Sequence, residues 1–207
     1  TNNLPDALPW LWMQLDQNIF KVSQTIPVVK AGRMTLLFPA WLPGNHAPRG
    51  SIDKLAALVI RANGRELIWK RDTVDVFAFH IDVPAGAKML DISFDYLSAT
   101  ASDQGRVVVT REMMNLQWET VSLYPAGYFV RRIPVKATVT YPAGWKAATA
   151  LRPTLEAVGG RGYTVEYAPI SYEVLIDSPV FAGKHFRRDD LGQGVVLNTV
   201  ADSAKEL

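Results

Sequence analysis

The sequence predicts an all-β fold, either an antiparallel β-sandwich or a saddle-shaped assembly of sheets. Short runs in which apolar and polar residues alternate recur along the 207 residues, and a period of two is the pattern of strands. Turn-forming pairs such as Asn63-Gly64 separate neighbouring runs. The chain also scatters 13 prolines and 14 glycines evenly, which denies any long helix its interior.

The first clear strand covers residues 19–26, where Phe20, Val22 and Gln24 share one face of the run. Residues 74–83 alternate in the same way and predict a second strand. The remaining expected elements, in chain order, are strands at 33–38, 56–62, 66–70, 88–97, 105–110, 133–141, 145–150, 163–168, 180–186 and 194–200, with helical turns only at 51–57 and 111–115.

The turns between these runs have the residues that reversals require. Asn63-Gly64 fits a tight hairpin, and Pro84-Ala85-Gly86 and Pro142-Ala143-Gly144 interrupt later runs. No internal repeat or linker divides the chain. We therefore expect an amino-terminal extension over residues 1–18 and one β-rich domain over residues 19–207.

Composition excludes several classes of function. The net charge is +2, from 22 basic and 20 acidic residues, which is too weak a field to predict a nucleic-acid partner. Cysteine is absent, so neither disulfides nor thiolate metal ligands are possible. The longest apolar runs are a few residues long and are broken by proline, so no transmembrane segment is expected.

The sequence contains no complete catalytic motif, and we expect no catalytic residue and no metal ligand in this chain. The three histidines, His46, His80 and His185, are far apart and form no H-E-x-x-H pair. A metal site would require at least two of them to meet in space, which is the least favoured interpretation. No G-x-S-x-G segment is present to carry a nucleophilic serine.

The tryptophans offer a second kind of site, because exposed aromatic side chains on a β-sandwich can stack on sugar rings. Most of the six tryptophans are expected in the core, where large aromatic side chains fill the space between sheets. Trp41 and Trp118 each lie next to a Pro-rich or polar turn. These two are the candidate contact residues of a carbohydrate-binding module.

Several segments resemble one family in the same order along the chain. The segments are 19–28, 41–48 (Trp-Leu-Pro-Gly-Asn-His-Ala-Pro), 72–80, 115–118, 123–127 and 177–183. Together they are similar to the amino-terminal domain of the glycyl aminopeptidase family of gluzincin-like zinc metallopeptidases, over roughly residues 19–203. The resemblance implies a β-rich domain like the one that opens aminopeptidase N-like enzymes.

The resemblance also implies what this chain lacks. In full-length members a helical catalytic domain with H-E-x-x-H and a further glutamate follows, and it binds the zinc ion. No such motif occurs here, so the chain alone is expected to be inactive and to hold no cofactor. Its implied partners are its own catalytic domain and a peptide substrate. Family members are commonly exported, which favours the periplasm or cell envelope and leaves the cytoplasm open.

A finer resemblance concerns residues 116–119, Leu-Gln-Trp-Glu, followed by Tyr124-Pro125. This segment is similar to a Thr-Gln-aromatic-Glu stretch in aminopeptidase N relatives, whose glutamine reaches the amino-terminal end of the substrate. The comparison implies a substrate-binding segment of Gln117, Trp118 and Glu119, in which Gln117 and Glu119 hold the free α-amine. The alternative is that Gln117 satisfies a strand edge and Trp118 packs in the core.

Two classes of function therefore remain. The chain is either the non-catalytic leading domain of a zinc aminopeptidase, which helps to form the substrate cleft, or a free-standing binding module. An exposed apolar patch near residues 111–128 or near the carboxyl end favours the first class. A concave aromatic groove formed wholly within the chain favours the second.

Overall fold

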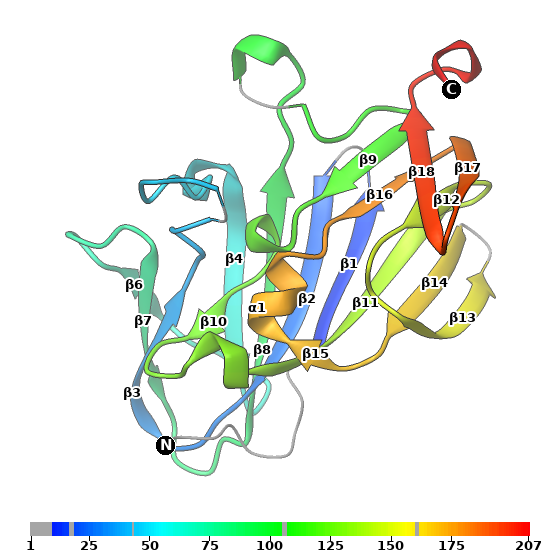
Figure 1. Ribbon diagram of the computed structural model, residues 1–207. Coiled ribbons are helices and arrows are strands. Elements are labelled where there is room, and N and C mark those ends of the chain that lie inside the picture. The colour runs from blue at the N-terminus through cyan, green and yellow to red at the C-terminus, as the bar shows by residue number, and fades with distance from the viewer. Residues whose placement is uncertain (1–9, 17–18, 43, 105–106, 160–161) are drawn as a thin grey trace.

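The computed structural model describes residues 10–16, 19–42, 44–104, 107–159 and 162–207, and these residues form a mostly antiparallel β fold (Figure 1). Its largest sheet runs β13-β14-β11-β1-β2-β8-β4-β5, with β15 pairing separately to β11. The strands of this main sheet are β1 (Trp10–Asp16), β2 (Ile19–Pro27), β4 (Leu55–Ala62), β5 (Arg65–Glu66), β8 (Met89–Leu97), β11 (Pro134–Pro142), β13 (Pro153–Gly159), β14 (Gly162–Tyr167) and β15 (Ile170–Ser171).

Three smaller sheets complete the strands, in the orders β10-β3-β7-β6, β12-β16-β9 and β17-β18. Their bounds are β3 (Gly32–Leu37), β6 (Trp69–Arg71), β7 (Ala78–Val83), β9 (Met113–Leu116), β10 (Tyr124–Pro125), β12 (Lys146–Ala148), β16 (Val180–Gly183), β17 (His185–Gly192) and β18 (Val195–Ala201). The helices are α1 (Tyr172–Ile176) and the 3-10 turns η1 (Ile52–Lys54), η2 (Ser102–Gln104), η3 (Trp118–Thr120), η4 (Val130–Arg132) and η5 (Ala204–Glu206). None of the described helices is long and apolar enough to cross a membrane.

The alternation in β2 has the predicted consequence for packing. Phe20, Val22 and Gln24 are buried on one face of the strand. Phe94 of β8 lies directly opposite Val22 in the antiparallel register, so both strands bury the same face. The all-β prediction is confirmed by these pairings.

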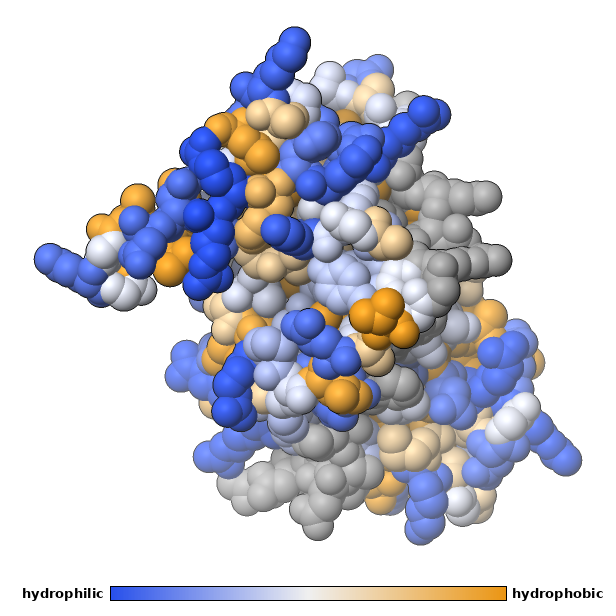
Figure 2. Space-filling model, turned by 90° about the vertical axis from the view of Figure 1, so that its right-hand side faces the viewer, coloured by the Kyte–Doolittle hydropathy of each residue, from blue (hydrophilic) through white to orange (hydrophobic). Residues whose placement is uncertain are grey.

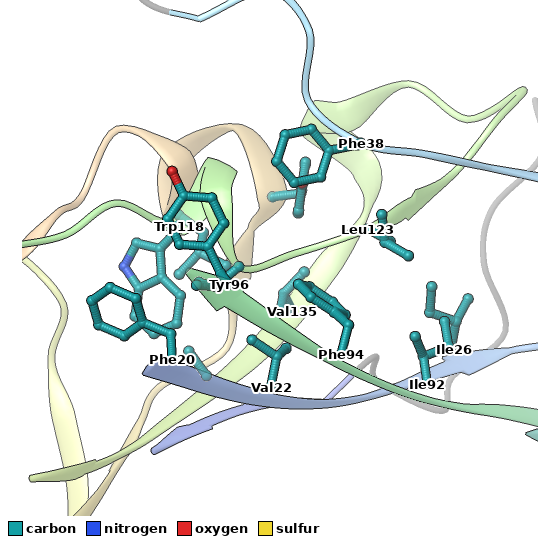
Figure 3. Packing of buried hydrophobic residues seen from close by; sticks show 14 of the residues in the cluster. Phe20, Val22, Ile26, Phe38, Ile92, Phe94, Tyr96, Trp118, Leu123 and Val135 are labelled. Carbon is teal, nitrogen blue, oxygen red and sulfur yellow. The ribbon is translucent and has the colours of Figure 1, made fainter. Parts of the chain in front are cut away.

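The core lies between this face of the main sheet and the segments that cross it. Figure 3 shows side chains of β2 and β8 pointing toward Phe38, Trp118 and Leu123, which come from two other parts of the chain, the segment after β3 and the segment between β9 and β10. All three are at most 1% exposed. Because Trp118 belongs to this cluster, the position of η3 is fixed by core packing rather than by local sequence.

The chain reverses where the sequence predicts a strand over 105–110 and a helical turn over 111–115, and both expectations are wrong for the described residues. Residues 105–106 lie outside them, and Val109 makes only an isolated bridge to Met114. The hydroxyl of Thr110 accepts hydrogen bonds from the backbone N–H groups of Glu112 and Met113. This side chain closes a turn, after which the chain continues directly into β9.

The strand expected over 74–83 begins only at Ala78, because carboxylates organise the preceding residues as a turn. Oδ1 of Asp72 accepts from the N–H groups of Val74 and Asp75 at 2.8 and 2.9 Å. Oδ1 of Asp75 accepts from the N–H of Phe77 at 3.1 Å. Local side-chain hydrogen bonds thus replace ladder pairing between residues 72 and 77.

Other predicted boundaries shift for local reasons. The run over 180–186 is divided at Lys184 into β16 and β17, which pair in different sheets. Only residues 52–54 of the helical turn expected over 51–57 are helical. Helix α1 is too short to show a helical period, and the hydroxyl of Ser171 caps it by accepting from the N–H of Val174.

The expected extension over residues 1–18 contains a strand of the main sheet. Residues 10–16 form β1, which pairs antiparallel with β2 and parallel with β11. β1 therefore lies between β11 and β2 and joins the two parts of the main sheet. Residues 1–9 and 17–18 lie outside the described residues.

Candidate functional site

A cleft of about 550 Å³ opens beside the carboxyl end of β8. Five separate parts of the chain form its walls: the loop before β4, the end of β8, Val108 before β9, the η3 turn, and the end of α1 with the residues that follow it. The lining residues are Leu42, Asn45, Ser51, Asp53, Lys54, Tyr96, Leu97, Ser98, Ala99, Val108, Gln117, Glu119, Thr120, Ile176, Asp177 and Pro179. Gln117 and Glu119, two of the predicted substrate-binding residues, therefore face the same cleft.

Gln117 is held at the start of η3 by both its backbone and its side chain. Its carbonyl oxygen accepts from the N–H and the hydroxyl of Thr120 at 3.0 and 2.7 Å. Its Nε2 donates to Oδ1 of Asn115 at 2.7 Å. Asn115 is only 6% exposed, so this bond orients the side-chain amide of Gln117. Its Oε1 is then the atom that can accept a hydrogen bond from a ligand.

Trp118, the third residue of the predicted substrate-binding segment, does not line the cleft. Its side chain is 0% exposed, and its indole Nε1 donates to the carbonyl oxygen of Ser178 at 2.8 Å. Gln117, Glu119 and Thr120 line the cleft, whereas Trp118 of the same turn packs into the core. The indole consequently supports the site without being able to touch a ligand.

Acidic side chains dominate the charge of the cleft. Asp53, Glu119 and Asp177 line it together with one cation, Lys54. Burial raises the pKa of Tyr96, and the nearby carboxylates of Asp53 and Glu119 raise that pKa further. A negative potential of this kind favours a bound ammonium group.

Sequence reasoning missed the contributions of Asp53, Tyr96 and Asp177 to this cleft. Asp53 lies in a 3-10 turn, Tyr96 near the end of a strand, and Asp177 directly after a helix. No local motif links these three positions. The only available signal was the similarity of residues 177–183 to the resembled family, which carries no information about what the side chains face.

The histidines form no common site in the described part of the chain. His80 is satisfied by two neighbours, since Nδ1 lies 2.9 Å from the hydroxyl of Thr35 and Nε2 lies 2.8 Å from Oδ2 of Asp72. His185 lies 3.4 Å from Oε2 of Glu112. Across the residues that the structure describes, no group of three or more His, Asp or Glu side chains is arranged to hold a metal ion.

Of the two tryptophans predicted to contact ligands, Trp41 is exposed. Its side chain is 69% accessible, and its backbone forms an isolated bridge with Pro48 that closes the intervening loop. Trp41 lies next to Leu42, a residue of the cleft, but borders a separate groove.

Apolar side chains are also exposed near the carboxyl end. On the β17–β18 hairpin Leu191, Val195 and Leu197 are 63%, 55% and 47% exposed. Figure 2 shows the side of the molecule on which this hairpin lies, and hydrophobic residues there are interspersed with hydrophilic ones. These exposed apolar side chains are scattered rather than gathered in one patch. The expectation of an exposed interface near the carboxyl end therefore stays a prediction.

Solved structures with a similar fold are zinc peptidases and their relatives. An aminopeptidase N family protein from Idiomarina loihiensis aligns with a TM-score of 0.71 and 17% identity, over 92% of this chain and 32% of that one. An M1 zinc metallopeptidase from Deinococcus radiodurans aligns at 0.52 and 12%, over 96% and 47%. Leukotriene A4 hydrolase from Saccharomyces cerevisiae aligns at 0.52 and 9%, over 95% and 31%.

These likenesses concern the fold, because all three identities are low. The chain spans less than half the length of each of these proteins. A search of curated protein sequences finds no match. Residues 12–184 match the family described as the peptidase M61 N-terminal domain, which includes the cleft residues from Leu42 to Pro179. The chain therefore belongs to the peptidase M61 N-terminal domain family.

Proposed function

We propose that this domain is the non-catalytic leading part of a zinc-dependent aminopeptidase of the glycyl aminopeptidase type, and that it forms one wall of the substrate cleft. The observation that carries the proposal is the joint placement of Gln117 and Glu119 in a cleft of about 550 Å³. The zinc ion would be held by the catalytic domain. This domain would supply binding groups for the substrate.

The chemistry of the cleft fits the free α-amine of a peptide. An ammonium group donates three hydrogen bonds and needs acceptor oxygens, which amide carbonyls and carboxylates provide. Oε1 of Gln117 is oriented by the bond between Nε2 and Asn115, and Glu119 adds a charge of the opposite sign. Asp53 and Asp177 add to the negative potential.

The same proposal assigns an interface to the catalytic domain. The relatives of known structure are two to three times as long as the part that this chain covers. Apolar residues on the β17–β18 hairpin are exposed here and would be suited to burial against a second domain. Burial of such residues is a common source of stability at domain interfaces.

Kinetics of the full-length protein test the role of the cleft. Gln117→Ala and Glu119→Gln are expected to lower kcat/KM for an amino-terminal glycine substrate by roughly tenfold each, as loss of a charge-assisted hydrogen bond implies. The matched control is Glu66→Gln, at an exposed carboxylate on β5 outside the cleft. Unchanged kcat/KM in both cleft variants would refute the proposed amine recognition.

A further inference from the structure

A second groove, of about 480 Å³, is bordered by both partners of the Trp41–Pro48 bridge. We call it the Trp41 groove. It is lined by Leu37, Phe38, Ala40, Trp41, Pro48, Val74, Asp75, Val76, Phe77 and Tyr124. These residues come from the end of β3 and the segment after it, the turn before β7, and β10, so tertiary packing brings them together.

Aromatic side chains from all three segments border the Trp41 groove. Trp41 is 69% exposed, which leaves much of the indole accessible, whereas Phe77 and Tyr124 are partly covered and pack against the core. Val74 and Val76 border the groove from the turn and are 92% and 42% exposed. Accessible aromatic rings around a concavity provide negative π faces to whatever binds there.

Among the described residues that line the groove, Asp75 is the only acidic one, and none is Lys, Arg or His. Burial raises the pKa of Tyr124, and the nearby carboxylate of Asp75 raises it further, which places that charge beside the phenol. Arg71 is not in the lining, and its Nε donates to the carbonyl oxygen of Val76 at 2.6 Å. The groove therefore combines aromatic rings with an acidic side chain.

The wall that carries Asp75 is ordered before any ligand arrives. Asp72 accepts two backbone hydrogen bonds within the turn, and Asp75 accepts a third, from Phe77. Asp72 is itself held by Nε2 of His80, whose Nδ1 contacts the hydroxyl of Thr35 on β3. A site whose acidic wall is already fixed loses little conformational entropy on binding.

We propose that the Trp41 groove binds an organic cation, an alkylammonium or guanidinium group, between its aromatic rings and Asp75. Such groups are attracted to the faces of aromatic rings, tryptophan most strongly, and a neighbouring carboxylate supplies a countercharge. Lysine or arginine side chains of a peptide have this chemistry, and so do free quaternary ammonium compounds. The proposal concerns side-chain or free cations and is separate from recognition of the α-amine by Gln117.

Titration of the 207-residue protein with blocked probes tests the proposal. The probes are acetyl-Ala-Lys-Ala-amide, its uncharged norleucine analogue, and tetramethylammonium, and none of them has a free α-amine. The readout is the NMR shift of the Trp41 indole N–H, which is assigned by its disappearance in Trp41→Phe. We expect saturable shifts with the lysine peptide and none with the norleucine peptide. Saturation by tetramethylammonium alone would assign the groove to free organic cations.

Variants separate a cation site from a merely apolar one. Trp41→Ala and Asp75→Asn are each expected to weaken probe binding by about threefold to thirtyfold. Binding to Trp41→Ala is measured by calorimetry, because this variant lacks the indole N–H that serves as the NMR readout. Asn retains an oxygen that accepts from the Phe77 N–H, so Asp75→Asn removes charge and keeps the turn. Phe129→Ala and Asp82→Asn, at exposed residues outside the groove, are matched controls.

Two results would overturn the proposal. Equal binding of the norleucine peptide, or no binding by any of the three probes, would show that the groove does not select a cation. Unchanged affinity in Asp75→Asn would lead to the same conclusion. Gln117→Ala is expected to leave probe binding unaltered, so failure of amine recognition and failure of this proposal can be told apart.

Discussion

Nε1 of Trp118 donates a 2.8 Å hydrogen bond to the carbonyl oxygen of Ser178, sixty residues further along the chain. This bond joins two walls of the cleft from beneath, because Gln117 and Glu119 flank Trp118 and Asp177 and Pro179 flank Ser178. Both partners are buried. A buried core contact thus links these two walls of the cleft.

Substitution of Trp118 tests this connection. Trp118→Phe is expected to lower the free energy of unfolding by about 1–3 kcal/mol, since the Ser178 carbonyl loses its indole donor and a small void remains. Trp118→Ala is expected to cost about 3–5 kcal/mol. Urea unfolding measures both. Trp41→Ala, at an exposed tryptophan, should change stability by no more than about 0.5 kcal/mol. A Trp118→Phe protein as stable as the parent would contradict the role of the bond.

Gln24 offers a second test, because its side-chain amide makes two hydrogen bonds with the backbone of Leu123, as a neighbouring strand would. Nε2 donates to the Leu123 carbonyl at 2.6 Å, and Oε1 accepts from the Leu123 N–H at 3.0 Å. Gln24→Leu should leave both buried backbone groups unpaired and lower the free energy of unfolding by about 2–5 kcal/mol. Chemical denaturation measures the loss. Ser23→Ala, on the exposed face of the same strand, is the control and should be close to neutral.

The His80–Asp72 pair predicts a dependence of stability on acid pH. The hydrogen bond from His80 lowers the pKa of Asp72 to about 2, from an ordinary value of 3.8, and the backbone bonds from Asp75 and Val74 contribute. A carboxyl group whose pKa is depressed by folding stabilises the folded state above its unfolded pKa. This contribution is expected to decline as the pH falls from about 4 through about 2.

Unfolding measured between pH 2 and pH 6 checks this expectation. The difference in stability between the parent and Asp72→Asn should be largest above pH 4 and should shrink toward pH 2. Asp82→Asn controls for the general loss of one negative charge. If the parent and Asp72→Asn differ by the same amount at every pH, the carboxylate is not stabilised by folding in the way described.

Gly50 is required by a close backbone approach. A Cβ at this position would lie 2.0 Å from the carbonyl oxygen of Pro39, and the N–H of Gly50 already donates to Ala40 at 3.1 Å. Gly50→Ala is therefore expected to destabilise the fold by about 1–3 kcal/mol, measured by thermal or urea unfolding. Gly159→Ala, where the nearest contact is an ordinary 3.8 Å, should be much milder. Equal effects at the two positions would argue against a steric cause.

The predictable part of the fold rests on local signals. In β2 the alternation around Phe20 and Val22 gave the correct buried face, because a strand has a side-chain period of two wherever it lies. Asn63 and Gly64 have φ values of 52° and 73°, as expected for this pair in a tight turn. By contrast, the turns built on Thr110 and Asp72 were missed, since side-chain hydrogen bonds there outweigh the apolar pattern.

The candidate site was likewise predictable from the sequence only in part. Similarity along the chain directed attention to Gln117 and Glu119, and the structure places both in the cleft. Sequence similarity could not show that Trp118 points into the core, or that Asp53 and Asp177 line the same cleft from distant segments. These facts depend on how sheets and turns far apart in sequence are packed.

By itself the sequence determined the all-β class, the faces of the regular strands, the tight hairpin turns and the resemblance to the leading domain of a zinc peptidase. Each of these follows from periods and motifs that act over a few residues or recur in order. Only the tertiary structure decided which side chains meet, in the acidic cleft around Gln117 and in the groove around Trp41. The reason is physical: convergence is fixed by non-local burial and hydrogen bonding, which no local pattern encodes.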